Sequence, residues 1–311
     1  MITDLFSVFG VQVSLNPQKD LPFASTFQAL GVLVNLEAVR EGSFEVTNKP
    51  GRLEALEAEV AAVRNRGLFS APEAATLKGR FQYADAQLFG KIAMPALRVL
   101  SQRAHRSGGC QVADDEILGA LDWLVKHVLS SPPRRVLRAS VRPPLLVLTD
   151  GACEGQSWES VTIGGILLDP EDGTVEYFGC RVPERTLLTW WAATGPRQTI
   201  GQAELLPAVM ARRHWMTRIA GRRIFFFLDN NSARDALVRG DSAAASSRAL
   251  LRAFYRIEAR APCTAWFTRV ATAANAADGP SRLSFAWAGA LPGAVRVHPH
   301  LDFEEEESAL W

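Results

Sequence analysis

The sequence lacks the features that would place it in several other protein classes. Its 311 residues include only four scattered cysteines, so neither a disulfide framework nor a short-spaced zinc motif is predicted. No stretch approaches the roughly 20 apolar residues of a membrane span, and the first residues lack the basic segment and long apolar core of a signal peptide. The net charge of +1 argues against a purely electrostatic coat for nucleic acid and leaves a local basic surface open. We therefore expect a soluble, intracellular protein, cytoplasmic or nuclear.

The first half of the chain changes from a strand pattern to a helical pattern at about residue 49. Two strands are predicted, over residues 27–36 and 42–46. Helical spacing then predicts a first helix through Leu53 and Val63, a second from Ser70 to before Gly90, and two more over residues 95–106 and 114–129. Residues 130–144 hold two proline pairs and four arginines, which is typical of a linker or exposed tether.

Strand and helix patterns alternate after residue 144. The predicted strands and helices lie, in turn, over residues 145–150, 161–168 and 174–180 (strands), 202–218 (helix), 223–229 (strand), 232–239 and 246–259 (helices), 263–269 (strand) and 276–283 (helix). This order is typical of a mixed α/β sheet with helices on its faces. Residues 303–311 contain a run of glutamates and are predicted to be a frayed acidic tail.

Four acidic residues of the second half occupy positions where a sheet gathers ligands. Asp150 and Asp229 each end an apolar strand, and ligands bind at the carboxyl ends of strands in open α/β sheets. Glu204 lies in the first turn of a predicted helix, and Asp278 begins the last helical segment. If the first and fourth strands are neighbours, Asp150 and Asp229 lie side by side with Glu204 and Asp278 above them.

Carboxylates held that close repel one another, so the pKa of each rises unless a cation intervenes. Hard divalent cations with oxygen ligands relieve this repulsion. Two such ions about 3.5–4 Å apart activate a water and stabilise the leaving oxygen of a phosphodiester. We predict two Mg²⁺ ions, or Mn²⁺ in their place. No histidine base is then needed, which suits a segment, residues 143–285, whose only histidine is His214.

Each acid also has an ordinary structural explanation. Asp150 before a glycine forms a turn, and Glu204 near a helix start is favoured by the helix macrodipole. Asp229 followed by Asn230 caps the next helix, and Asp278 before Gly-Pro is a common turn composition. For each acid taken singly, the structural explanation is better than the metal-site explanation. Taken together, four acids at the expected points of one topology favour a metal site.

Four short motifs, in order along the chain, resemble the ribonuclease H domain of retroelement polyproteins. They are TDGACEG at residues 149–155, IGQAELLPAV at 200–209, FFLDNNSARDALVRG at 226–240 and RVATAANAADGPSRL at 269–283. The last has the Asn-x-x-Asp-x-x-Ser-Arg pattern of DIRS-like and related retrotransposons. The resemblance implies a ribonuclease H-like mixed five-stranded sheet with flanking helices.

The resemblance also implies a catalytic, metal-binding set made of Asp150, Glu204, Asp229 and Asp278. In the family's pattern Asp150 and Asp229 contact both ions, Glu204 the ion that activates water, and Asp278 the other ion. The histidine-bearing loop that speeds product release in some ribonucleases H is absent.

The upstream half resembles the end of a reverse-transcriptase palm that runs into thumb and connection helices. FQALGVLVNL (residues 27–36), NKPGRLEALEAEV (48–60) and the segment 77–104 carry this likeness. The implied divisions are a palm-end hairpin (1–48), thumb- or connection-like helices and tether (49–142), the ribonuclease H-like domain (143–285) and a C-terminal tail (286–311). The fingers and the Tyr-x-Asp-Asp type palm motif are missing, so no polymerase activity is expected.

A hybrid substrate also needs contacts outside the metal site. The predicted substrate-binding residues are Asn230, Asn231, Arg282, Trp190, Trp191, Lys78 and Arg80. Each type has an alternative role: cations suit a solvated helix face, tryptophans anchor a long loop in the core, and asparagines cap helices.

The sequence therefore predicts a metal-dependent endonuclease that cuts the RNA strand of RNA–DNA hybrids, within a retroelement-derived polyprotein. The expected partners are the hybrid and either a reverse-transcriptase palm and fingers subunit or the rest of the polyprotein, with no membrane. Two alternatives stay open: a catalytically inactive nucleic-acid-binding remnant, and a DNA-acting nuclease of the same superfamily.

Overall fold

The computed structural model describes residues 8, 24–86, 90–106, 109, 111–137, 142–154, 161–194 and 199–301. The predicted acidic tail, residues 303–311, lies outside them. Among these residues, no helix combines the length and the apolar character needed to cross a membrane.

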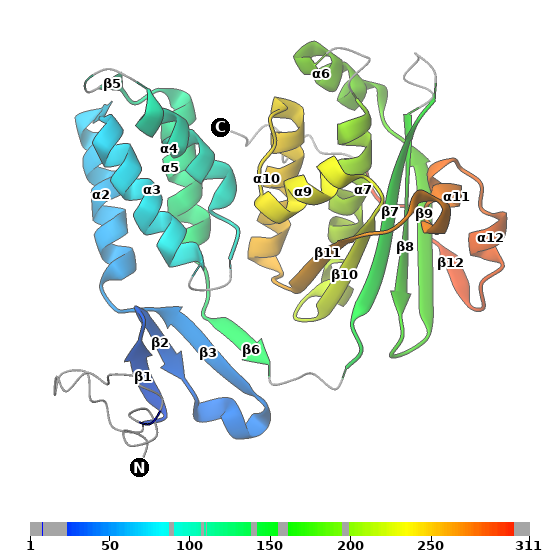
Figure 1. Cartoon of the computed structure of the whole chain (residues 1–311), viewed down its shortest axis with the longest axis horizontal. Coiled ribbons are helices and arrows are strands. Elements are labelled where there is room, and N and C mark those ends of the chain that lie inside the picture. The colour runs from blue at the N-terminus through cyan, green and yellow to red at the C-terminus, as the bar shows by residue number, and fades with distance from the viewer. Residues whose placement is uncertain are drawn as a thin grey trace.

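A small antiparallel sheet opens the described chain (Figure 1). Its strand order is β1-β2-β3-β6, made of β1 (Thr26–Ala29), β2 (Val32–Asn35), β3 (Ser43–Asn48) and β6 (Arg134–Leu137). A 3-10 helix, η2 (Glu37–Glu41), joins β2 to β3.

Two predictions are wrong in this sheet. Residues 27–36 form a hairpin, not one strand, because Leu30 and Gly31 turn the chain with φ of 49° and 80°. The predicted tether contains β6, which pairs with β3. Proline and arginine are tolerated at the margins of an edge strand, which explains why composition alone indicated a linker.

Helices pack together next to this sheet and form a core of their own. They are α2 (Arg52–Arg66), α3 (Ala71–Ala86), α4 (Met94–His105) and α5 (Asp115–Leu124), which continues as the π-helical turn η3 (Val125–Leu129). A short ladder of β4 (Leu68–Phe69) and β5 (Gln111–Val112) joins α2 and α5.

The predicted helix starts are confirmed by their hydrogen bonds. The backbone N–H of Ser70 donates to Glu73 Oε2 at 2.8 Å, and the Glu73 N–H donates to Ser70 Oγ at 3.3 Å, which is a capping box. Asp114 caps α5 by accepting from the Ile117 N–H at 2.9 Å.

The second sheet has the described strand order β11-β10-β7-β8-β9-β12. Its strands are β7 (Leu145–Cys153), β8 (Val161–Asp169), β9 (Thr174–Arg181), β10 (Arg223–Leu228), β11 (Thr264–Arg269) and β12 (Ala294–Arg296). β7, β8 and β9 form an antiparallel meander, whereas β10 runs parallel to β7 and β11, and β12 runs parallel to β9. The predicted mixed α/β fold is therefore confirmed. A sixth strand, β12, corrects the predicted five, and it lies within the segment 286–311 predicted to be a tail.

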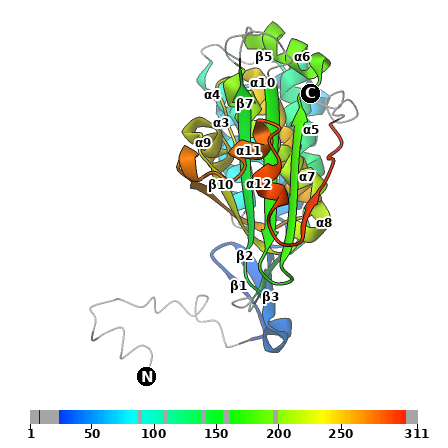
Figure 2. The ribbon, with the colours of Figure 1, turned by 90° about the vertical axis from the view of Figure 1, so that its right-hand side faces the viewer.

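Helices cover the two faces of this sheet unequally. α7 (Ile200–His214) and α10 (Ala245–Arg260) bury one face, together with α8 (Met216–Ile219). α11 (Asp278–Ser281) and α12 (Ala286–Gly289) lie on the other face, in front of β8 and β9 in Figure 2. α9 (Asn231–Arg239) follows β10, and the 3-10 helix η6 (Thr272–Ala274) follows β11. α6 (Glu184–Thr194), where no helix was predicted, precedes α7.

The helical body and the second sheet are joined by polar contacts. The Lys91 ammonium donates to the carbonyl of Val238, on α9, at 2.9 Å. Arg134, on β6, donates to the carbonyl of Cys263 at 3.0 Å, just before β11. These bonds connect segments more than a hundred residues apart, so the two cores pack side by side.

Candidate metal centre

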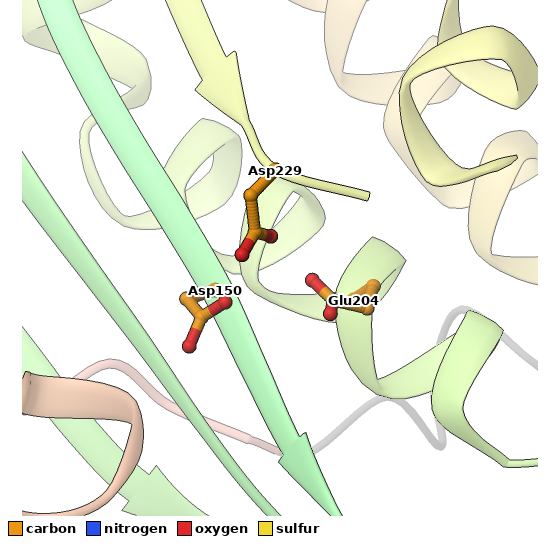
Figure 3. Close-up of side chains that lie close together, drawn as sticks. All are labelled: Asp150, Glu204 and Asp229. Atoms are coloured by element: carbon orange, nitrogen blue, oxygen red, sulfur yellow. The ribbon is translucent and has the colours of Figure 1, made fainter. Parts of the chain in front are cut away.

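Three carboxylates from separate elements of the second sheet converge (Figure 3). Asp150 lies on β7, and Asp229 follows β10 directly. The parallel pairing of β7 with β10 sets Phe227 opposite Leu148, so that two residues further along Asp229 comes beside Asp150. Glu204 reaches them from α7. One carboxylate oxygen of each residue lies within 4.8 Å of the other two.

Gly151 permits the close approach of α7 that brings Glu204 into this group. A Cβ at this position would lie 2.2 Å from the carbonyl oxygen of Ala203 and 2.7 Å from the backbone nitrogen of Glu204. Real Cβ atoms do not make such contacts with backbone, so a larger residue would push α7 away. β7 runs to Cys153, three residues beyond its predicted end, so the Asp-Gly pair lies within the strand, where it serves both the ligand and the packing of the helix.

Burial and mutual repulsion make the carboxyl groups of Glu204 and Asp150 hard to ionise. Burial raises the pKa of Glu204 to about 8, and the charges of Asp150 and Asp229 add to the rise, against hydrogen bonds from Gly151 and Asn230. Burial likewise raises the pKa of Asp150 to about 6, with contributions from the charges of Asp229 and Asp278. The hydroxyl of Ser281 opposes that rise.

Two oxygens of the group have no hydrogen-bond donor among the described residues. Glu204 Oε2 and Asp229 Oδ1 are buried and unpartnered. A buried carboxylate oxygen without a donor is costly. A hard divalent cation would bind both oxygens and offset the repulsion that raises the two pKa values. The residues present therefore fit a divalent metal ion held by Asp150, Glu204 and Asp229.

Asp278, the fourth predicted acid, lies outside the group of three. Its side chain, at the start of α11, is 40% exposed and accepts a hydrogen bond from Arg282 Nε at 3.0 Å. Its charge nevertheless contributes to the raised pKa of Asp150. The structure thus brings three of the four predicted acids into contact distance and leaves the fourth beside them, paired with a cation.

α11 supplies a residue that the sequence reasoning did not single out. The single proton of the Ser281 hydroxyl is shared between two acceptors, Asp150 Oδ2 and the carbonyl oxygen of Asp278, the latter at 2.8 Å. The segment lies flat on the sheet because Gly164 and Gly179 have no side chains: a Cβ there would lie 2.3 Å from Ser281 N and 2.2 Å from the carbonyl oxygen of Pro280. The Ser-Arg pair of the last motif was the available signal.

Asn275 is a second residue that was missed. Its side-chain amide donates to the carbonyl of Thr149 at 3.1 Å, and the residue is 4% exposed. This bond ties the last motif to the strand residue that precedes Asp150. The asparagine of the Asn-x-x-Asp pattern therefore positions the segment that carries Asp278.

The predicted substrate-binding asparagines and Arg282 lie near the group in different settings. Asn230 caps α9, since its Oδ1 accepts from the Ala233 N–H at 3.0 Å, and it also bonds Glu204. Asn231 is exposed. Arg282 forms ion pairs with Asp278 and Glu154.

The predicted tryptophan contacts need correction. Trp190 belongs to the core of the sheet and is 3% exposed, so it offers no face for stacking on a substrate. Trp191 is half-buried and packs against the same core. Both lie on α6 rather than on a loop, and core anchoring is the role that the structure supports.

The predicted cations of α3 already have partners within the helical body. Lys78 Nζ donates to Ser101 Oγ at 3.1 Å. Arg80 forms an ion pair with Glu59. Both side chains are partly exposed helix-face cations, which suits the solvated-face alternative as well as a contact with phosphate.

Comparison with known proteins finds likeness in structure but not in sequence. No protein-family model matches the chain, and no curated protein matches its sequence. The structure is similar to ribonuclease H1 of the halophilic archaeon Halobacterium salinarum NRC-1, with 18% identity, a TM-score of 0.36, and coverage of 47% of this chain and 100% of that one. It is also similar to the N-terminal ribonuclease H domain of a Mycobacterium tuberculosis protein, solved as a fusion with maltose-binding protein, with 12% identity, a TM-score of 0.34, and coverage of 47% and 96%.

A longer stretch is similar to a foamy viral protease-reverse transcriptase in complex with double-stranded DNA. The identity is 13%, the TM-score is 0.28, and the match covers 80% of this chain. It spans 38% of the length of that viral chain.

Proposed function

We propose that this protein is a metal-dependent endonuclease that cuts the RNA strand of RNA–DNA hybrids, as part of a retroelement-derived polyprotein. The observation that supports this most strongly is the buried group of Asp150, Glu204 and Asp229, in which two carboxylate oxygens have no donor among the residues that the structure describes. The choice of a hybrid as substrate rests on the resemblance of the four sequence motifs, in order, to retroelement ribonuclease H.

In this proposal Asp150, Glu204 and Asp229 hold two Mg²⁺ ions, or Mn²⁺ in their place. When bound, such ions activate a water and stabilise the leaving oxygen of a phosphodiester. The Ser281 hydroxyl fixes the orientation of Asp150 through its hydrogen bond. Asn230 does the same for Glu204. Asp278 remains the proposed fourth acid, because its charge acts on Asp150.

The experiment compares substrates and variants under matched conditions. Labelled RNA–DNA hybrid, single-stranded RNA and duplex DNA are incubated with the full chain in Mg²⁺, with and without chelator. We expect cleavage of the hybrid's RNA strand only, abolished by chelator. Asp150→Asn should slow cleavage at least about 100-fold, since the metal site supplies several kcal/mol of transition-state stabilisation. Asp115→Asn, at an exposed position on α5, is the matched control and should cut normally.

Three results would contradict the proposal. Hybrid cleavage by Asp150→Asn at the wild-type rate would show that Asp150 does not belong to the active site. Hybrid binding without cleavage, in Mg²⁺ and in Mn²⁺, would identify an inactive nucleic-acid-binding remnant. Cleavage of duplex DNA in place of the hybrid would identify a DNA-acting nuclease. We also expect no primer extension, because the sequence holds no Tyr-x-Asp-Asp motif.

A further inference from the structure

The sheet face that carries Asp150 is open over β10 and β11. On the opposite face, Ile224, Phe226 and Leu228 of β10 are at most 1% exposed, buried under α7 and α10. On the face of Asp150, Phe225 is 37% exposed and Trp266 is 66% exposed. α11 and α12 cover the β8 and β9 side of this face, away from β11 (Figure 2).

The exposed aromatic residues form a row across β10 and β11, on the same face as the acids and four residues before them along the strands. β7, β10 and β11 are parallel, and Phe225 pairs in register with Leu146 on one side and with Trp266 on the other. Side chains two residues apart on a strand share a face. Asp229 lies four residues beyond Phe225, as Asp150 does beyond Leu146, so the row is about 13 Å from the acids at about 3.3 Å per residue.

The charges around this row favour a polyanion. β10 and β11 contain two charged residues, Arg223 and Arg269, and both are exposed. Arg269 pairs with Leu228 and so lies on the opposite face, which leaves Arg223 as the charged residue of these two strands on the face of the row. Arg223 lies two residues before Phe225, on the same face, and one of its guanidinium nitrogens donates to the carbonyl of Arg142 at 2.9 Å. On β7 the only charged residue is Asp150 itself. No carboxylate of these three strands therefore repels a phosphate near Trp266.

The aromatic side chains of the row favour unpaired bases, whose ring faces are not already stacked on neighbouring bases. Tryptophan and phenylalanine side chains on an open sheet stack with unpaired bases, and this stacking tolerates any sequence because every base has a π-face. Paired bases within a duplex are already stacked on their neighbours. A single-stranded segment is therefore the partner that this face fits, with Arg223 near its phosphates.

We propose that Phe225 and Trp266 form a stacking platform for unpaired nucleotides next to the metal site. The proposal rests on the nuclease function above and names its preferred substrate: a hybrid with a single-stranded extension that runs from the cut site across β10 and β11. The platform would hold the extension while the duplex lies at Asp150.

Binding is the direct test, and it is measured without cleavage. Hybrids with and without a single-stranded extension are titrated against the full chain carrying Asp150→Asn, with fluorescence anisotropy as the readout. Trp266→Ala should reduce the preference for the extended hybrid about tenfold, which is typical of losing one stacked base. Trp266→Phe should recover part of it. Trp287→Ala is the matched control, because Trp287 is 57% exposed but lies on α12.

Several outcomes would overturn the platform. Equal loss of preference in Trp266→Ala and Trp287→Ala would show a nonspecific effect. An unchanged preference in Trp266→Ala would show that the row does not touch the extension. Loss of a dimer in Trp266→Ala, seen by sedimentation with the preference unchanged, would identify the face as a contact between copies of the chain. Blunt-hybrid cleavage by the wild type tests the nuclease proposal separately, so either proposal can fail alone.

Discussion

Replacing Glu204 by glutamine is expected to stabilise the metal-free protein at alkaline pH. Burial and the neighbouring aspartates raise the pKa of Glu204 from its ordinary value of 4.5 to about 8. Because the folded state then holds the proton more tightly than the unfolded state, stability is lost as pH rises from about 4.5 through 8. Glutamine cannot ionise, so the variant avoids this loss. It also removes a metal ligand, so it should gain less stability from Mg²⁺.

The magnitude follows from the size of the pKa change. A rise from 4.5 to about 8 corresponds to an upper limit of about 5 kcal/mol above pH 8, at about 1.36 kcal/mol per pH unit. Relaxation of the protein and entry of water reduce such costs. We expect about 1–3 kcal/mol at pH 8.5, which raises Tm by at least about 3 °C for a domain of this size. At pH 5 the difference should fall below about 1 kcal/mol.

Thermal unfolding at pH 5 and at pH 8.5, each with chelator and with excess Mg²⁺, measures both effects. Glu57→Gln changes an exposed glutamate on α2 and should behave like the wild type throughout. In chelator at pH 8.5 the Glu204→Gln protein should unfold at the higher temperature, and Mg²⁺ should narrow or reverse the gap. A variant less stable than the wild type in chelator at pH 8.5, or an equal gain from Mg²⁺ in both proteins, would refute the reasoning.

Two further sites give sharp predictions. Gly151→Ala should abolish hybrid cleavage and cost about 1–3 kcal/mol of stability, because its methyl group would lie 2.2 Å from the carbonyl oxygen of Ala203. The matched control is Gly201→Ala on α7, the helix that carries Ala203. An added Cβ there has nothing within 4 Å, so this variant should raise Tm slightly. An equal loss of stability in the two variants would contradict the packing argument. In the wild type the Ser281 hydroxyl lowers the pKa of Asp150, so this pKa should rise in Ser281→Ala. The acidic limb of the pH–rate profile at limiting Mg²⁺ should therefore move to higher pH. An unmoved limb would show that the hydroxyl does not act on that carboxylate.

The positions of the acids were predictable because each is tied to a local signal. Asp150 and Asp229 end apolar runs, and the sequence analysis assumed that the two strands are neighbours, as the pairing of β7 with β10 shows them to be. Glu204 lies in a helix whose start is clear in the sequence. The distance of Asp278 from the others was not predictable, because it depends on how α11 lies across glycines of β8 and β9, each more than a hundred residues before the α11 residue that it contacts.

The elements that were missed share a physical cause. β6 and β12 are short strands whose existence depends on a distant partner, β3 and β9, rather than on local alternation. α6 was expected to be a loop, with its tryptophans either at the substrate or anchored in the core. Trp190 fills the core, so its large apolar area stabilises the helix against the sheet. Local patterns thus located the chemistry better than the edges of the fold.

The proposed function depends on one claim: three carboxylates, from β7, from α7 and from the end of β10, together hold a divalent metal ion. Diffraction from crystals soaked in Mn²⁺, recorded where manganese scatters anomalously, tests this most directly. We predict an anomalous peak coordinated by Asp150, Glu204 and Asp229, and its loss in Glu204→Gln crystals. Crystals in which Mn²⁺ occupies other sites while these three carboxylates bind none would contradict the proposal.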